Sequence, residues 1–217
     1  MNRLCVLFLA FALALASHAF AQAPGVPGKF DFYVLALSWS PSYCEAAGER
    51  ADNDQCRRGR PFSFVVHGLW PQYERGYPRS CVNPAPWLPE ALIRSMLELM
   101  PARGLVINEW RRHGTCAGLP PERYFETLRH ARERVVIPER FRRLDGFVKL
   151  PTAEIEEEFI AANQELKADM IAITCDNGRL REVRVCMSKE LTFRSCPEVD
   201  RRACQRRRVV MPPMRGG

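Results

Sequence analysis

Histidine and lysine are scarce in this 217-residue sequence, which has four histidines. Its 13 glycines are too few for a collagen-like chain. Only four of the 32 basic residues are lysines, so arginine carries nearly all the positive charge. Its planar guanidinium suits phosphate and carboxylate groups, although a biased genome composition would produce the same excess. The 47% hydrophobic content excludes a disordered chain and predicts one globular domain, whose formal charge of +7 is compatible with an anionic polymer as partner.

Long apolar runs and closely spaced cysteines are also missing. No segment after residue 30 is long and apolar enough to cross a membrane, and no Cys-x2-Cys or Cys-x3-Cys spacing supports a zinc ribbon. At the N-terminus, Arg3 precedes an apolar run over 4–16, and the small residues Ala19 and Ala21 follow it. This pattern predicts a secretory signal peptide over residues 1–21, with a buried N-terminal helix as the alternative.

The signal peptide accounts for an odd number of cysteines. Cys5 would leave with it, and the even set that remains is typical of a disulfide framework in an exported protein. Spacing alone leaves about 105 ways to pair eight cysteines. We therefore expect a periplasmic or secreted protein without a membrane span, whose cysteines are Cys44, Cys56, Cys81, Cys116, Cys175, Cys186, Cys196 and Cys204.

Hydrophobic periodicity predicts strands and helices that interleave along the chain. We expect strands over 30–39, 62–66, 170–174, 180–187 and 191–194, and helices over 90–100, 106–116, 122–135 and 152–166. Asn177 and Gly178 are typical of a hairpin turn between two of the strands. Since the strands and helices follow no regular βαβ spacing, the sequence predicts an α+β single domain.

Two short stretches concentrate residues with chemical potential, and the first is the sequence HGLWPQ at 67–72. His67 is expected at the end of an apolar strand, where a rigid element would hold an imidazole beside a cleft. Imidazole titrates near neutral pH and suits proton transfer. Taken singly, however, such a histidine is more often structural, and Trp70 is more often a core residue.

The second stretch is EWRRHGTC at 109–116. In a helix, Glu109, Arg112 and His113 would share one face because they are three and four residues apart. A carboxylate can orient a histidine, and a guanidinium can neutralise charge on a phosphoryl oxygen. An ordinary surface ion pair is the alternative. The presence of two such histidines favours acid–base chemistry at phosphorus.

Together these two stretches resemble the two active-site signatures of the ribonuclease T2 family, in the expected order. The strand before Pro41 and Cys44 is also similar to the first strand of that family, and the resemblance covers about residues 30–205. It implies a bacterial exported, ribonuclease I-like member with an α+β fold, in which a central antiparallel sheet packs against helices and disulfides staple one domain. It also implies cleavage of single-stranded RNA through a 2′,3′-cyclic phosphate, without metal or cofactor.

The resemblance implies a role for each matching residue. His113 corresponds to the general base that takes the proton of the 2′-hydroxyl, and His67 to the general acid that protonates the departing 5′-oxygen. Glu109 would support the base and the phosphorane, and Trp70 would help to form the base-binding site.

Two residues depart from the family pattern. Arg112 stands where lysine is usual, which keeps the positive charge that stabilises the phosphorane but changes its reach. Asn108 stands where many members have a histidine, so a neutral amide would contact the phosphate.

The resemblance also implies three disulfide pairs and the extent of the catalytic domain. Three pairs follow from it, and they leave Cys44 to pair with Cys56. We expect a flexible leader over 22–29, the catalytic domain over 30–205 and a monomer. The arginines, two prolines and two terminal glycines near the end of the chain predict a basic and disordered tail over 206–217. The three implied pairs are Cys81–Cys116, Cys175–Cys204 and Cys186–Cys196.

Two other functions remain open. A metal-dependent phosphohydrolase could use His67, Glu109 and His113 as ligands, although their spacing differs from that of zincins. A non-catalytic, exported RNA-binding module would keep the disulfides and the basic surface but would need neither histidine.

Overall fold

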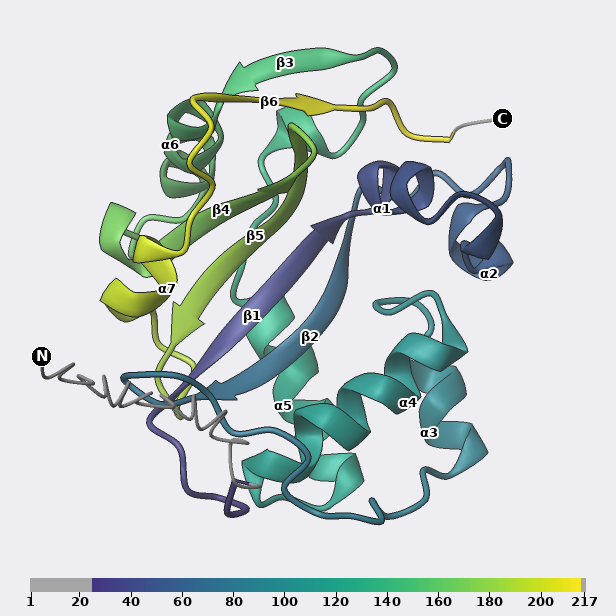
Figure 1. Cartoon of the computed structure of the whole chain (residues 1–217), viewed down its shortest axis with the longest axis vertical. Helices are drawn as coiled ribbons and strands as arrows, with labels where there is room; N and C mark the ends of the chain where they lie inside the picture. The colour runs from purple at the N-terminus through teal and green to yellow at the C-terminus, as the bar shows by residue number, and fades with distance from the viewer. Residues whose placement is uncertain (1–24, 216–217) are drawn as a thin grey trace, which may run out of the picture.

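The central element is a mixed sheet, seen in a computed structural model that describes residues 25–215 (Figure 1). The predicted signal peptide and the start of the leader lie outside the described residues. Within them, the strand order is β2-β1-β5-β6-β3, and β4 pairs with β5. The strands are β1 Phe32–Trp39, β2 Phe64–Gln72, β3 Val148–Pro151, β4 Ile171–Asp176, β5 Arg179–Met187 and β6 Arg208–Met211.

Helices surround this sheet. Helix α5 lies behind β1 and β2 in Figure 1, and α3 and α4 lie beyond β2. The helices are α1 Ser40–Ala47, α2 Asn53–Cys56, α3 Glu90–Met96, α4 Arg103–Arg112, α5 Pro121–Glu133, α6 Thr152–Ala162 and α7 Pro197–Arg201. The prediction of an α+β domain with a disulfide framework is confirmed. The sheet is antiparallel except that β6 runs parallel to β5.

Strand β1 is the centre of the core. Its near-continuous apolar sequence is buried on both faces between two antiparallel neighbours, β2 and β5. One face packs its large side chains against α5, where Tyr124, Phe125 and Leu128 are fully buried. The opposite face carries smaller residues, among them Ala36 and Ser38. This second face therefore leaves room above the sheet.

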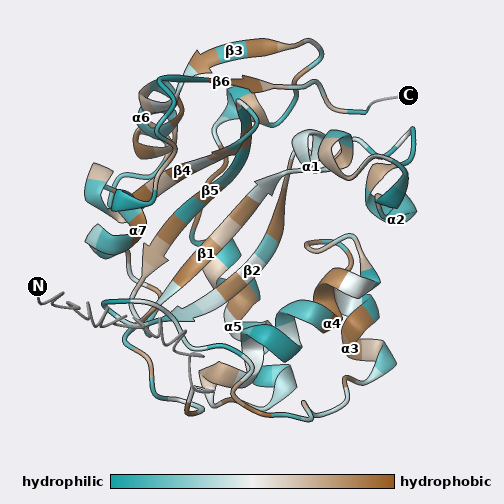
Figure 2. Cartoon of the chain, viewed as in Figure 1, coloured by the Kyte–Doolittle hydropathy of each residue, from teal (hydrophilic) through white to brown (hydrophobic). Residues whose placement is uncertain are grey.

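Strand β5 has most of its polar side chains in its first half. Figure 2 shows hydrophilic residues concentrated toward its start and hydrophobic residues at its end. The turn into β5 consists of Asn177 and Gly178, with φ angles of 47° and 78°. Positive φ at both positions is the requirement of a two-residue hairpin. The hairpin prediction is confirmed.

Several predicted boundaries are wrong. The strand expected to stop before His67 continues to Gln72, so the histidine lies within β2. The helix expected over 106–116 ends at Arg112 and is followed by a 3-10 turn over Gly114–Ala117. The segment 191–194 makes only an isolated bridge between Phe193 and Met187. The helices expected over 90–100 and 152–166 end earlier, at Met96 and Ala162.

The prediction of a disordered tail over 206–217 is wrong for its described part. Residues 208–211 form β6, which pairs with β3 and buries Val209 and Met211 completely. Trp39 Nε1 then donates a hydrogen bond of 3.0 Å to the carbonyl oxygen of Pro212. The composition of this stretch did not predict a strand, because it is rich in arginine and only two of the four side chains of β6 are buried.

The described part of the predicted leader, residues 25–29, is held by backbone hydrogen bonds. The N–H of Gly28 donates to the carbonyl oxygen of Cys116 at 2.9 Å, and the N–H of Lys29 donates to the carbonyl oxygen of Val26.

The four predicted disulfides are all present, namely Cys44–Cys56, Cys81–Cys116, Cys175–Cys204 and Cys186–Cys196. Gly28 and Cys81 therefore both fasten to the segment that follows His113.

Candidate active site

A β-bulge places His67 on the open face of the sheet. Across β1, Ala36 pairs with Gly68 and Leu37 pairs with Val66, so His67 is an extra residue in β2. A bulge redirects a side chain that strict alternation would send elsewhere. Thus a local irregularity of β2, not the end of a strand, positions the imidazole.

Helix α4 brings Glu109 against this bulge. The buried carboxylate accepts a hydrogen bond of 2.7 Å from Trp70 Nε1, and its other oxygen lies 3.5 Å from His67 Nε2. Gly68 makes this approach possible, because a Cβ added there would collide with the Glu109 carboxylate and the Trp70 indole. The glycine of the first motif therefore admits the glutamate of the second.

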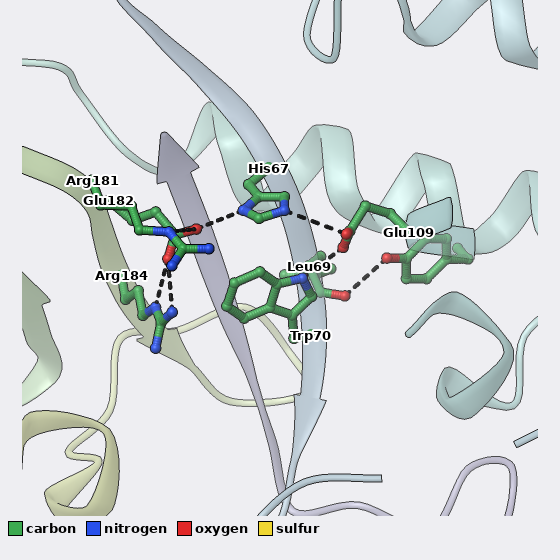
Figure 3. Close-up of polar contacts among 8 residues, drawn as sticks. His67, Leu69, Trp70, Glu109, Arg181, Glu182 and Arg184 are labelled. Atoms are coloured by element: carbon green, nitrogen blue, oxygen red, sulfur yellow. Dashed lines mark hydrogen bonds and ion pairs between the residues drawn. The ribbon is translucent and has the colours of Figure 1, made fainter. Parts of the chain in front are cut away.

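A second carboxylate holds His67 from the other side. Glu182 of β5 is fully buried, and its Oε1 lies 2.6 Å from His67 Nδ1 (Figure 3). Its other oxygen accepts two hydrogen bonds from Arg184, at 2.9 and 2.7 Å. The Arg184 guanidinium also lies 5.1 Å from the centre of the Trp70 ring. His67 is consequently fixed between two carboxylates.

Both histidines lie against Trp70. Ring centroids are 5.2 Å apart for His67 and Trp70, and 5.3 Å apart for Trp70 and His113. His113 follows the last residue of α4, and its N–H bonds to the carbonyl oxygen of Glu109. Its Nδ1 is buried and has no hydrogen-bond partner among the described residues. Within residues 25–215, burial and the charges of Arg112 and His67 act on His113, and no carboxylate is among these effects.

These surroundings shift the pKa values of the two imidazoles in opposite directions. Burial lowers the pKa of His67 and Arg181 lowers it further, but the hydrogen bond and charge of Glu182, together with Glu109, outweigh them and raise it. Burial, with the charges of Arg112 and His67, lowers the pKa of His113 to about 3. At neutral pH, His67 is the imidazole that favours a proton and His113 is the neutral one.

The carboxylates also differ. Burial raises the pKa of Glu109, against the opposing effects of His67 and Trp70. For Glu182, burial acts in the same upward direction, but His67 and Arg184 lower its pKa to about 2. Glu182 is therefore the permanent counter-ion of His67.

Two cavities meet at this site. A cavity of about 340 Å³ is lined by Trp70, Tyr77, Glu109 and His113, among others. A larger one of about 780 Å³ extends along α1 and the start of β5. His67 lines both cavities. A chain-like ligand could therefore pass the imidazole from one cavity to the other.

The residues predicted from the two motifs do not all come together. Glu109, Arg112 and His113 line the smaller cavity with His67 and Trp70. Asn108 lines the larger cavity instead, on the other side of His67. Trp70 has its Nε1 on Glu109 and its ring under Arg184, so its contacts position other side chains. The base-stacking role of Trp70 and the phosphate contact of Asn108 stay predictions.

Sequence reasoning missed three residues of the site, Arg181, Glu182 and Arg184. They lie 114 to 117 positions after His67, in a segment where the alternation of apolar and polar residues predicts a strand but no site. One signal was available: Glu182 interrupts a largely apolar strand, and arginines stand one residue before it and two residues after it. A carboxylate on a buried strand face requires a partner. That partner, His67, could not be named without the pairing of β1 with both β2 and β5.

Tyr124 connects the site to the core. Its fully buried hydroxyl donates a hydrogen bond of 2.9 Å to the carbonyl oxygen of Leu69, next to Trp70. Burial raises the pKa of Tyr124 well above its usual value, so this donor stays protonated. Helix α5 thereby fixes the first motif from behind the sheet.

No group of three or more His, Cys, Asp or Glu side chains in residues 25–215 has an arrangement suited to holding a metal ion. Metal independence stays a prediction, which the chelator experiment below tests. No helix in the same part of the chain is both long and apolar enough to span a bilayer.

The sequence model of the ribonuclease T2 family matches residues 30–196, which include the strands and helices of both motifs. The chain belongs to the ribonuclease T2 family. Relatives of this T2 chain include a ribonuclease of Aeromonas hydrophila, 43% identical over 129 residues, which are 59% of this chain and 57% of the relative. A probable ribonuclease of Haemophilus influenzae is 31% identical over 149 residues, 62% of this chain and 55% of the relative.

Ribonuclease I of Escherichia coli is 31% identical over 156 residues, 52% of this chain and 57% of the relative. This T2 chain therefore spans a little over half the length of these curated relatives. Among solved structures, trichomaglin, an S-like ribonuclease, has a TM-score of 0.62 at 18% identity, over 86% of this chain and 99% of that one. RNase NT with 5′-AMP has a TM-score of 0.56 at 22% identity, over 85% and 99%. At these identities the structures show a shared fold.

Proposed function

We propose that this T2 family member is an exported endoribonuclease that cleaves single-stranded RNA by transphosphorylation. The observation that carries the proposal is that the pKa values of His67 and His113, which both lie against Trp70, are shifted in opposite directions. Two titratable groups with pKa values pushed apart are suited to opposite proton-transfer roles. The charged His67 is the acid, and the neutral His113 is the base.

In the first step, His113 takes the proton of a ribose 2′-hydroxyl. The 2′-oxygen forms a bond to phosphorus, the bond from phosphorus to the 5′-oxygen breaks, and His67 gives its proton to that leaving oxygen. The products are a 2′,3′-cyclic phosphate and a new 5′-hydroxyl. Hydrolysis of the cyclic phosphate reverses the roles, with water in place of the 5′-hydroxyl.

The remaining side chains stabilise charge. Arg112 lines the same cavity as the two histidines and supplies a cation for the phosphorane. Glu109 lies within 3.5 Å of His67 and is held by Trp70, so it orients the site and balances its positive charge. The protein itself provides each of these groups, and the reaction requires neither metal nor cofactor.

Export and the monomeric state belong to the same proposal. Four disulfides are typical of proteins that fold in an oxidising compartment, and the apolar N-terminal run is typical of a signal peptide. Both features favour a periplasmic or secreted location, where we propose that a single chain acts on RNA.

The test compares an RNA oligonucleotide with the same sequence made of 2′-deoxy sugars, both in excess chelator. We expect cleavage of RNA alone, with a 2′,3′-cyclic phosphate at the new end, because only ribose has the internal nucleophile. Mass spectrometry of early products identifies that end. His67→Phe and His113→Phe should each lower the cleavage rate at least ~1,000-fold.

Each alternative function makes a different prediction in the same assay. Loss of cleavage in chelator, restored by a divalent metal, would establish a metal-dependent phosphohydrolase. RNA binding without cleavage, unchanged in both histidine variants, would establish a binding module. Cleavage of the deoxy oligonucleotide would exclude the internal 2′-hydroxyl as nucleophile.

A further inference from the structure

Two β-bulges, on the strands either side of β1, point their extra residues toward the same place. In β2 the extra residue is His67. In β5, Leu180 pairs with Cys175 and Glu182 pairs with Thr174, so Arg181 is the extra residue. Bulges are enriched beside active sites because they redirect side chains. Here they bring an imidazole and a guanidinium to one end of the site.

Arg181 occupies the junction between the two cavities. Among the residues that line them in the described part of the chain, only His67 and Arg181 line both. The two nucleosides joined by a phosphodiester require space on both sides of the phosphate. A phosphate attacked beside His67 therefore lies at the junction, within the surroundings of Arg181.

The Arg181 guanidinium is available for a ligand. Its side chain is 58% exposed, and its one ion pair among residues 25–215 is a distant contact of 3.8 Å with Glu182. The neighbouring arginines are engaged, since Arg184 makes two hydrogen bonds to Glu182 and Arg179 lies 2.5 Å from Glu45. Figure 3 shows Arg181 and Glu182 side by side, with the carboxylate directed at His67.

We propose that Arg181 binds a non-bridging oxygen of the scissile phosphate, from the side of His67 opposite to Arg112. The inference rests on the proposed ribonuclease activity. A guanidinium presents several N–H donors to phosphate, and it keeps its charge at every pH at which the enzyme works. Arg181 thus supplies the cation that a neutral Asn108 does not.

The test uses adenylyl-3′,5′-adenosine, whose single phosphate removes any contribution from distant phosphates. Arg181→Gln should lower kcat/KM by roughly 30-fold, somewhat less than the ~100-fold or more expected of a buried oxyanion donor. Arg181→Lys should recover part of the loss because it restores the charge. Arg143→Gln is the matched control, since Arg143 has the same charge, pairs with Asp145 and lines neither cavity.

A phosphorothioate version of the dinucleotide distinguishes contact from a general effect of charge. Sulfur replaces one non-bridging oxygen in each diastereomer, so a contact to one oxygen makes the two cleavage rates unequal. Arg181→Gln should change their ratio, whereas Arg143→Gln should leave it as in the wild type. Thermal unfolding of both variants checks that each is folded.

Binding of adenosine 3′-monophosphate, measured by calorimetry, separates this inference from the proposed reaction. Weaker binding in Arg181→Gln supports the phosphate contact even if the wild type fails to cleave the dinucleotide, an outcome that would refute only the ribonuclease. If the wild type cleaves, and Arg181→Gln matches it in rate, diastereomer ratio and nucleotide affinity, the assignment of Arg181 is overturned.

Discussion

At the scale of single residues, the site depends on the partners of two imidazoles. His67 has a carboxylate on each ring nitrogen, whereas buried His113 has a guanidinium neighbour and no carboxylate partner among the described residues. The same side-chain type therefore has opposite preferred charges within one site. Burial and the sign of the nearest charge are sufficient to explain the difference between the two pKa values.

The first prediction concerns Glu182→Gln. The wild type loses kcat/KM as the pH rises through the raised pKa of His67, because the acid must be protonated, and gains it as the pH rises through about 3, because His113 must be neutral. Removing the Glu182 charge lowers the pKa of His67. The alkaline limb should therefore move to lower pH by about one unit, while the acidic limb stays in place.

The measurement is the pH profile of kcat/KM, supported by NMR titration of the His67 ring. Glu90→Gln is a suitable control, because Glu90 pairs with Arg103 and Arg94 and lines neither cavity. A general loss of stability would lower activity at every pH. An alkaline limb that did not move in Glu182→Gln would refute the positioning role of Glu182.

At the scale of elements, close contact between β2 and α4 aligns the two motifs. The sequence predicted both elements, and it predicted that Glu109 and His113 would be near each other on one of them. It could not predict the bulge at His67, because hydrophobic periodicity detects strict alternation and a bulge interrupts it. It also could not show that Gly68 is required by a side chain from another element.

The second prediction is that Gly68→Ala lowers kcat/KM about 100-fold in a folded protein. The added methyl group would occupy the space of the Glu109 carboxylate and the Trp70 indole, so at least one of them must shift, and a shift of about 1 Å in a catalytic group has this effect. Cleavage of a dinucleotide measures it. Gly146→Ala is the control, because an added Cβ there meets no atom within 4 Å.

Equal activity of the two glycine variants would contradict the packing between the motifs. The same comparison by thermal unfolding separates a local shift from a loss of the fold. If Gly68→Ala were inactive only because it unfolds, its melting temperature would fall together with its activity.

At the scale of the whole molecule, the last described strand, β6, joins the edge strand β3 to the rest of the sheet. Strand β6 pairs with β3 at one edge, touches β5 through Arg179 and Val210, and supplies the acceptor for Trp39 Nε1 through Pro212. Residues from both ends of the described chain thus share one core. A basic composition near the terminus does not by itself indicate disorder.

The third prediction is that truncation after Gln205 destabilises the protein. It removes Val209 and Met211 from the core, each worth about 1.5–3 kcal/mol, and leaves Trp39 Nε1 without its acceptor. The free energy of unfolding should fall by about 4 kcal/mol or more, as measured by urea denaturation. The double variant Arg206→Ala and Arg207→Ala, which removes charge but keeps β6, should change it by less than ~1 kcal/mol. An equally stable truncated protein would show that β6 adds nothing to the core.

The sequence by itself determined the chemical groups of the site and the class of fold. Two local motifs contain the imidazoles, Glu109 and Arg112, and the spacing of apolar residues is sufficient to predict most strands and helices. The disulfide pairs followed from family resemblance. Only the tertiary structure decided which groups meet, because His67 and Glu182 are 115 positions apart and their contact depends on the register of three strands. That register is set by burial on both faces of the sheet and by two bulges, and such long-range packing leaves no periodic signal in the local sequence.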